Sequence, residues 1–152
     1  VDHLLAMVAV GLWSARALPV GRRGLGPLAF LVAMTLGAVA AAGGAVLPGV
    51  EAAIAASVLL MGTMLALARR LPVGPGLGLV AVAAVLHGLA HGSELPAGAG
   101  FAPYAAGFLL ATAGLHVAGL ALGLRFAETR EGAWRVAGSL LAGAGLVLLF
   151  PA

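Results

Sequence analysis

Long hydrophobic runs alternate with short polar breaks from one end of the chain to the other. Each run is close to the roughly 20 residues that an α-helix needs to cross about 30 Å of hydrocarbon. Aromatic residues are too few, and polar–apolar alternation too weak, for membrane-spanning strands. The pattern therefore predicts an all-α polytopic membrane protein, a bundle of six transmembrane helices. Their approximate bounds are residues 1–18, 25–47, 50–67, 76–94, 103–124 and 133–150.

The composition agrees with a lipid environment. Hydrophobic residues make up 62% of the chain and charged residues only 9%, whereas about 25% of a soluble domain is charged. The 24 glycines suit membrane helices, whose backbones approach closely where side chains are small. Cysteine is absent, so neither disulfides nor thiolate metal ligands are expected. With no linker or low-complexity tail, residues 1–152 are predicted to form a single six-helix transmembrane domain.

The basic residues predict the orientation of this bundle. All eight are arginines in or beside the connections after the first, third and fifth runs, while the other two connections have none. Because positively charged connections stay in the cytoplasm, both termini are predicted to lie outside, in the periplasm of a bacterial inner membrane. The arginines form no basic stripe, so nucleic acid is not an expected partner. They are Arg16, Arg22, Arg23, Arg69, Arg70, Arg125, Arg130 and Arg135.

Three ionisable residues share one stretch near the end of the fourth run: His87, His91 and Glu94. Steps of four and three residues place them within roughly 60° of one another on a helix that turns about 100° per residue. Ionisable groups are costly at membrane depth, so this stripe indicates a polar pathway or a metal site. His116, in the fifth run, lies about 13 Å before the cytoplasmic end at Arg125 and is therefore predicted at mid-membrane.

A second pair, Asp2 and His3, opens the first run. These residues lie about 20 Å above the cytoplasmic boundary near Arg16, so they also belong at membrane depth, in the outer half. The first run is short on its outer side and does not begin with Met, so we expect the natural N-terminus to lie upstream. Imidazole and carboxylate without thiolate favour a borderline divalent ion such as nickel, cobalt or zinc.

Two motifs resemble the HupE/UreJ family of nickel permeases. VDHLLAMVAVGLW, at residues 1–13, is similar to the first-helix signature of that family, and LHGLAHGSELP, at residues 86–96, to its fourth-helix signature. His116 falls where the fifth helix of the family carries a histidine. The resemblance extends over the whole chain and implies uptake of nickel, sometimes cobalt, for enzymes such as hydrogenase and urease. It implies that the metal path includes Asp2, His3, His87, His91 and Glu94.

We therefore expect a permease that takes up a divalent transition-metal ion, nickel first, with cobalt or zinc as alternatives, across the bacterial inner membrane. The expected partners are the ion and the lipid bilayer, with no prosthetic group, and the sequence leaves a homo-oligomer open. Two other classes fit the same residues: an intramembrane zinc-dependent hydrolase and a non-transporting accessory membrane subunit. Metal transport across a sealed bilayer separates the first class from both. The predicted metal-contacting residues are Asp2, His3, His87, His91, Glu94 and His116.

Overall fold

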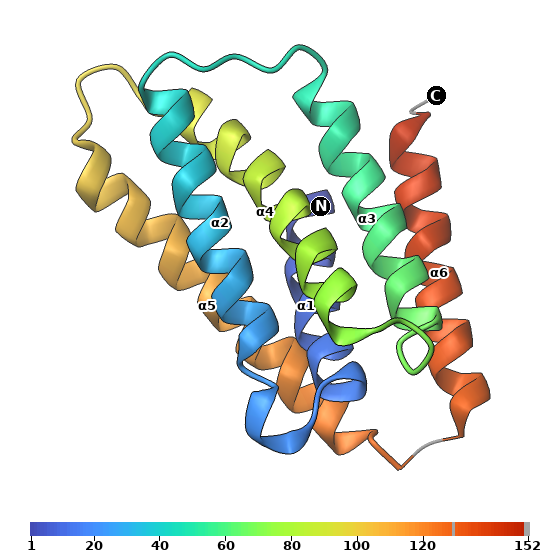
Figure 1. The fold of residues 1–152 in the computed structure, drawn as a ribbon. Helices are drawn as coiled ribbons and strands as arrows, with labels where there is room; N and C mark the ends of the chain where they lie inside the picture. The colour runs from blue at the N-terminus through green and yellow to red at the C-terminus, as the bar shows by residue number, and fades with distance from the viewer. Residues whose placement is uncertain (129, 151–152) are drawn as a thin grey trace.

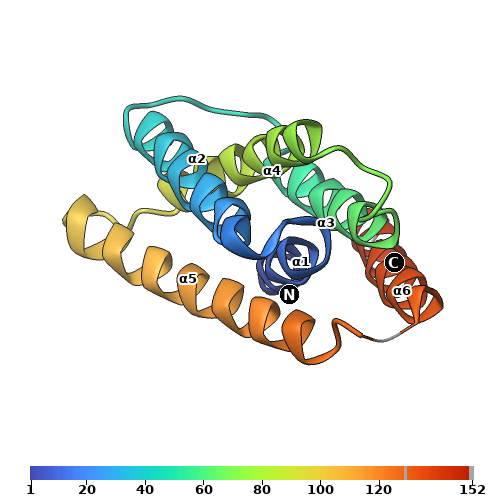
Figure 2. The same ribbon diagram turned by 60° about the horizontal axis from the view of Figure 1, so that its bottom comes forward.

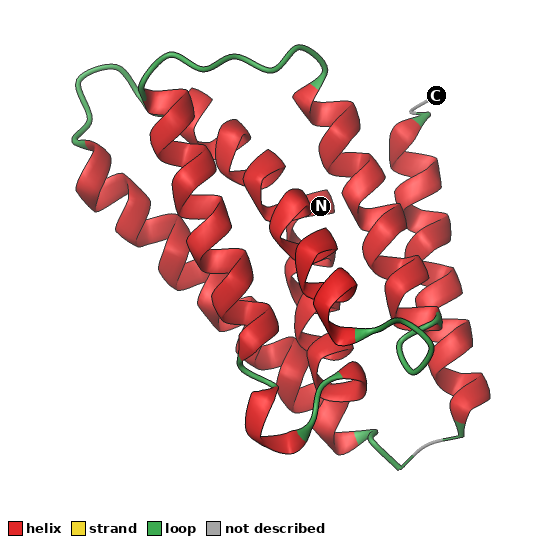
Figure 3. Ribbon diagram, in the orientation of Figure 1, coloured by secondary structure: helices red, strands yellow, loops and turns green. Residues whose placement is uncertain are grey.

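The computed structural model describes residues 1–128 and 130–150, and all regular structure within these ranges is helical (Figure 3). The prediction of an all-α protein is confirmed. The predicted single domain, residues 1–152, includes residues 129, 151 and 152, which lie outside the described residues. The helices are α1 (Asp2–Ala17), the 3-10 turn η1 (Val20–Arg22), α2 (Leu25–Ala42), α3 (Val50–Ala66), α4 (Val73–Ser93), α5 (Phe101–Arg125) and α6 (Glu131–Leu149).

The predicted end of the second helix is wrong. The hydrophobic run continues to residue 47, but α2 ends at Ala42. Gly44 follows in the left-handed conformation, with φ of 99°, and the amide of Ala45 donates to the carbonyl of Ala40 at 3.0 Å. This is a Schellman helix end, which glycine favours because it has no β-carbon to oppose a positive φ. The turn at Gly44 therefore ends α2 although the hydrophobic run continues to residue 47.

The fourth and fifth helices begin earlier than predicted, at Val73 and Phe101 rather than at residues 76 and 103. Each has a proline in its first turn, Pro75 or Pro103. A first-turn amide has no partner inside the helix, so a proline there removes no hydrogen bond. Pro75 therefore lies inside α4 rather than before it, and Pro103 is the third residue of α5 rather than the first.

Four helices are long and apolar enough to cross a membrane, judged by length and composition: α2 with the preceding turn, α4, α5 and α6. The apolar helix α3 is shorter, with 17 residues. Helix α1 has 16 residues and carries Asp2 in its first turn and Arg16 in its last. Length and composition alone therefore identify four of the six spans that the sequence predicts.

Helix α1 lies in the middle of the bundle and packs against α2, α3, α4, α5 and α6. Figure 2 shows α5 on one side of α1 and α2, α4 and α3 around the other. A β-carbon at Gly76 of α4 would overlap the fully buried indole of Trp13, and one at Gly26 of α2 would overlap the hydroxyl of Ser14. A central position explains why α1 can be short, since much of its surface meets protein rather than lipid.

The closest helix contacts occur in three pairs: α1 with α5, α2 with α4, and α3 with α6. In each pair, glycine lets one backbone touch the other. A β-carbon at Gly119 of α5 would overlap the carbonyl of Val8, and one at Gly88 of α4 would overlap that of Met34. At Gly138 of α6, it would overlap the backbone of α3. Close backbone packing of this kind drives helix association in lipid, where burial of apolar surface contributes little.

The bundle has two chemically different ends. The α1–α2, α3–α4 and α5–α6 connections lie at the lower end in Figure 1, and the α2–α3 and α4–α5 connections at the upper end. All eight arginines lie in or beside the lower connections. Helix α1 begins below the level of the upper connections (Figure 1), so its first residues lie within the height of the bundle.

Large apolar side chains cover the outer faces of the bundle. On α2 they recur every three or four residues, which forms a single stripe along the helix. Such continuous apolar surface suits contact with lipid rather than with water. The exposed side chains on α2, α5 and α6 include Leu28, Val32, Leu36, Val39, Leu110, Val117, Val136, Leu140 and Val147.

We predict that Gly119→Ala destabilises the protein by about 1–3 kcal/mol, because the added methyl group must displace the backbone of α1. Gly114→Ala, on the same helix, is the matched control, since a β-carbon there meets nothing within 4 Å. The free energy of unfolding in mixed micelles measures both. Equal stability of the two variants would contradict the backbone contact between α1 and α5.

Candidate metal-ion site

Helices α1 and α4 bring three histidines together. The ring centroids of His3 and His87 lie 4.6 Å apart with the rings almost perpendicular, at 87°. The centroids of His3 and His91 lie 5.0 Å apart at 62°. His87 and His91 come from successive turns of α4, and His3 faces them from α1. We call these three residues the histidine cluster.

Asp2 holds one nitrogen of His3. Its Oδ1 accepts a 2.7 Å hydrogen bond from the backbone amide of His3 and lies 3.0 Å from His3 Nδ1. Because a carboxylate only accepts, this contact favours a proton on Nδ1 and a lone pair on Nε2. His3 Nε2 is buried and has no hydrogen-bond partner among the described residues. Carboxylate partners orient metal-binding histidines in this way, so Asp2 supports His3.

His87 is the most deeply placed member of the cluster, with no exposed surface. Its Nε2 lies 2.8 Å from the hydroxyl oxygen of Ser57 on α3. Its other nitrogen, Nδ1, is buried and has no hydrogen-bond partner in the described part of the chain. His87 and His3 therefore each have one nitrogen held by a neighbour and one without a partner.

His91 and Glu94 lie nearer the end of α4. The His91 ring stacks on Phe108 of α5, with centroids 4.7 Å apart and an interplanar angle of 2°. His91 Nδ1 and Glu94 Oε2 are 3.9 Å apart, which is beyond hydrogen-bond distance. The Glu94 side chain is 59% exposed and that of His91 only 19%. Glu94 is therefore at the surface, and His91 lies between it and the interior.

His116 is set apart from the histidine cluster. It is 1% exposed, and neither of its ring nitrogens has a hydrogen-bond partner among the described residues. The fully buried ring of Phe30 contacts both histidines, with its centroid 5.0 Å from that of His116 and 5.6 Å from that of His87. The structure thus places an apolar ring against both His116 and the cluster.

Four residues near these histidines were not predicted from the sequence: Phe30, Ser57, Phe108 and Thr112. Thr112 lies one turn before His116, and its hydroxyl is 3.3 Å from the sulfur of Met7. Ser57 and Thr112 could have been identified from the sequence, because each places a hydroxyl group in an otherwise apolar run. Nothing in the sequence distinguishes the two phenylalanines, because their roles depend on which helices meet.

The described residues contain no set of three or more His, Cys, Asp or Glu side chains arranged ready to hold a metal ion. Within the cluster, the rings of His87 and His91 each contact the ring of His3. Such an arrangement is no preformed cage. A conduction path must bind its ion weakly enough to release it, so a rigid closed site is not what a path requires.

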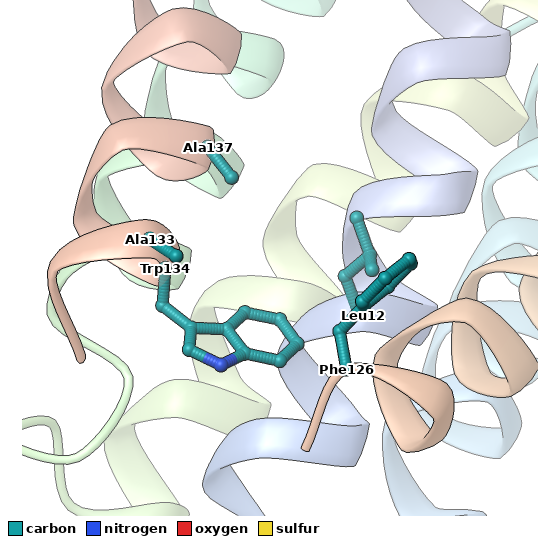
Figure 4. A pocket seen from close by; sticks show the side chains of 5 residues that line it. All are labelled: Leu12, Phe126, Ala133, Trp134 and Ala137. Carbon is teal, nitrogen blue, oxygen red and sulfur yellow. The ribbon is translucent and has the colours of Figure 1, made fainter. Parts of the chain in front are cut away.

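An apolar pocket of about 170 Å³ lies elsewhere, between α1, α6 and the end of α5 (Figure 4). Trp134 forms one wall, and the guanidinium carbon of Arg16 lies 5.4 Å from the centre of the Trp134 ring. None of the lining side chains is a metal-ligand type. They are Leu12, Phe126, Ala133, Trp134 and Ala137. The pocket therefore belongs to the arginine-bearing end and not to the histidine cluster.

The HupE / UreJ protein family model matches residues 1–148. The chain belongs to the HupE/UreJ family. It is 42% identical over 151 residues to "Protein HupE" of Rhizobium leguminosarum bv. viciae, an alignment that covers 97% of this chain and 78% of that protein. No solved structure matches the chain.

The predicted family is thereby confirmed. Membership of the HupE/UreJ family implies an integral membrane protein of the nickel/cobalt transporter type. Proteins of this family are transporters.

We predict that His3→Ala and His87→Ala each weaken equilibrium Ni²⁺ binding by at least about 10-fold, since loss of an outer-sphere partner alone costs about 10–100-fold. His116→Ala should leave the affinity unchanged, because His116 makes no described ring contact with the cluster. Calorimetric titration of the three variants in detergent measures this. An equal loss in His116→Ala would place His116 in the same binding site and contradict its separation.

Proposed function

We propose that this chain is a permease that moves Ni²⁺ inward across the bacterial inner membrane by way of the histidine cluster. The observation that carries the proposal is the convergence of His3 from α1 on His87 and His91 from α4, inside a bundle of apolar helices. Ionisable side chains within such helices are expensive and mark ion pathways. The experiment that tests it is Ni²⁺ uptake into sealed proteoliposomes.

The donor chemistry supports a borderline divalent ion. Imidazole binds nickel, cobalt and zinc well, whereas Mg²⁺ and Ca²⁺ prefer shells of oxygen atoms. The chain has no cysteine to favour softer ions. Membership of a family of the nickel/cobalt transporter type favours Ni²⁺ first, with Co²⁺ and then Zn²⁺ as the alternatives.

The order of exposure supports a direction along the path. The exposed carboxylate of Glu94 attracts the hydrated cation and helps to remove its water. His91, which is mostly buried, receives the ion one turn deeper, and His3 and His87 follow. His116 binds the ion after the cluster. Phe30 lies against both His116 and His87 and so connects the two positions.

The driving force for inward movement is the membrane potential. A negative interior favours the inward movement of each positive charge by about 2.3 kcal/mol per 100 mV, so a dication gains about 4.6 kcal/mol. Nucleotide hydrolysis is not required for uptake down this gradient. The sequence has no lysine, and therefore no phosphate-binding G-x-x-x-x-G-K-[ST] loop.

The proposed topology has six spans, with the arginine-bearing end in the cytoplasm and both termini in the periplasm. The gathering of all arginine-bearing connections at one end of the bundle supports it (Figure 1). The short helix α1 is compatible with six spans because protein surrounds it. In this orientation Glu94, which follows α4, faces the periplasm.

We predict saturable Ni²⁺ uptake into proteoliposomes that contain the full-length protein, driven by a negative interior. His87→Ala and His91→Ala should abolish it, and His116→Ala should slow it while Ni²⁺ binding is retained. Val82→Ala is the control on α4, because its side chain is 61% exposed on the outside of the bundle. Tight metal binding without uptake above that of empty liposomes would overturn the transport proposal and favour the zinc hydrolase.

We predict that the thiol of the Ala97→Cys variant reacts with a membrane-impermeant maleimide in intact spheroplasts, whereas that of Glu128→Cys reacts only after lysis. Ala97 lies in the α4–α5 connection and Glu128 in the α5–α6 connection, and both are exposed. The chain has no cysteine, so unsubstituted protein gives no background. The reverse labelling pattern would invert the proposed topology.

A further inference from the structure

Ser57 of α3 makes two short polar contacts in the interior of the bundle. Its Oγ lies 2.7 Å from the carbonyl oxygen of Ile54, one turn earlier on the same helix. The same Oγ lies 2.8 Å from Nε2 of His87 on α4. Ser57 is 3% exposed and His87 is 0% exposed. These contacts therefore form without competition from bulk water.

The number of hydrogens decides the direction of both bonds. A carbonyl oxygen only accepts, and a serine hydroxyl has a single hydrogen. At 2.7 Å the hydroxyl must donate to the Ile54 carbonyl, since two oxygens this close without a hydrogen between them would repel. Ser57 Oγ therefore accepts from His87, so His87 carries a proton on Nε2. Neutral imidazole has a single N–H, which leaves the lone pair on Nδ1.

Two ring nitrogens of the histidine cluster have no hydrogen-bond partner among the described residues. Nδ1 of His87 is buried without a hydrogen-bond partner among the described residues, and so is Nε2 of His3, whose Nδ1 faces Asp2. The two rings are in edge-to-face contact, with centroids 4.6 Å apart. Each of the two neighbouring rings thus has one lone pair that no described residue occupies.

We propose that Ser57 is a positioning residue that holds His87 with its proton on Nε2 and its Nδ1 lone pair directed to the transported cation. The inference rests on the proposed function for the identity of the ion, but not for the hydrogen bond itself. Ser57 determines which nitrogen of His87 carries the proton, as Asp2 does for His3. The metal thus binds His3 through Nε2 and His87 through Nδ1.

The first test is the tautomer of His87 in the metal-free protein. Nitrogen NMR of histidine-labelled protein in micelles, at about pH 8 and so above the ordinary imidazole pKa of about 6.5, separates protonated from unprotonated ring nitrogens. The His87 signals are those that disappear in His87→Gln. Wild-type protein should show His87 protonated on Nε2 alone. Protonation on Nδ1 would overturn the proposal, and this result does not depend on the folding of any Ser57 variant.

The second test compares three substitutions on α3. Ser57→Ala should mix the two His87 tautomers and weaken Ni²⁺ binding by about 10–100-fold, the usual loss for an outer-sphere partner. Ser57→Thr keeps the hydroxyl and should retain a single tautomer and the affinity. Thr63→Ala is the matched control, because Thr63 also bonds to its own helix, through the carbonyl of Leu59 at 2.9 Å, but is exposed.

The outcomes separate this inference from the proposed function. A single His87 tautomer that Ser57→Ala leaves unchanged would overturn the role of Ser57. A mixed tautomer in Ser57→Ala with unchanged Ni²⁺ affinity would overturn the positioning of Nδ1 toward the metal. If the wild-type tautomer is as expected but the protein binds no Ni²⁺, the permease proposal fails while the Ser57–His87 hydrogen bond stands.

Discussion

Close packing of α4 against α2 is the constraint on which the candidate site depends. The α4 stretch alternates histidine and glycine as His87-Gly88 and His91-Gly92, so each residue type recurs four residues later on its own face of the helix. The glycine face meets the backbone of α2, where added β-carbons would overlap Met34 and Ala38. The histidine face lies about 100° away around the helix. Contact of the glycines with α2 therefore turns the imidazoles toward α1. The pairing of α4 with α2 thus also determines the position of the candidate site.

The polar groups inside the bundle follow a common rule. His3 and His87 each have one ring nitrogen held by a neighbour, Asp2 or Ser57, and the other left without a partner among the described residues. An unsatisfied buried polar group is destabilising, particularly in a medium without water. Two such nitrogens on neighbouring rings are explained if a passing cation binds them. His116 differs, because neither of its nitrogens is held and its described ring neighbour is Phe30.

The position of α1 links the architecture to the chemistry. A helix of 16 residues at the surface of the bundle would leave a polar first turn facing lipid. At the centre, its first turn brings Asp2 and His3 to α4, while its last turn brings Arg16 to Trp134 at the other end. Glycines at the crossing with α5 allow the backbones of α1 and α5 to come into contact. The longer helices then present their apolar stripes to lipid.

The sequence by itself determined the all-α class, the approximate helix positions, the family and the ionisable residues of the fourth helix, because hydrophobic runs and i, i+4 spacing are local properties of a chain. It did not determine the early end of α2, where the left-handed Gly44 stops the helix although the hydrophobic run continues. Tertiary structure alone decided that His3 faces His87, that Phe30 touches His116, and that Ser57 holds one nitrogen of His87. These contacts join residues up to 86 positions apart in sequence, and only the packing of whole helices, set by where glycine permits backbones to meet, brings such residues together.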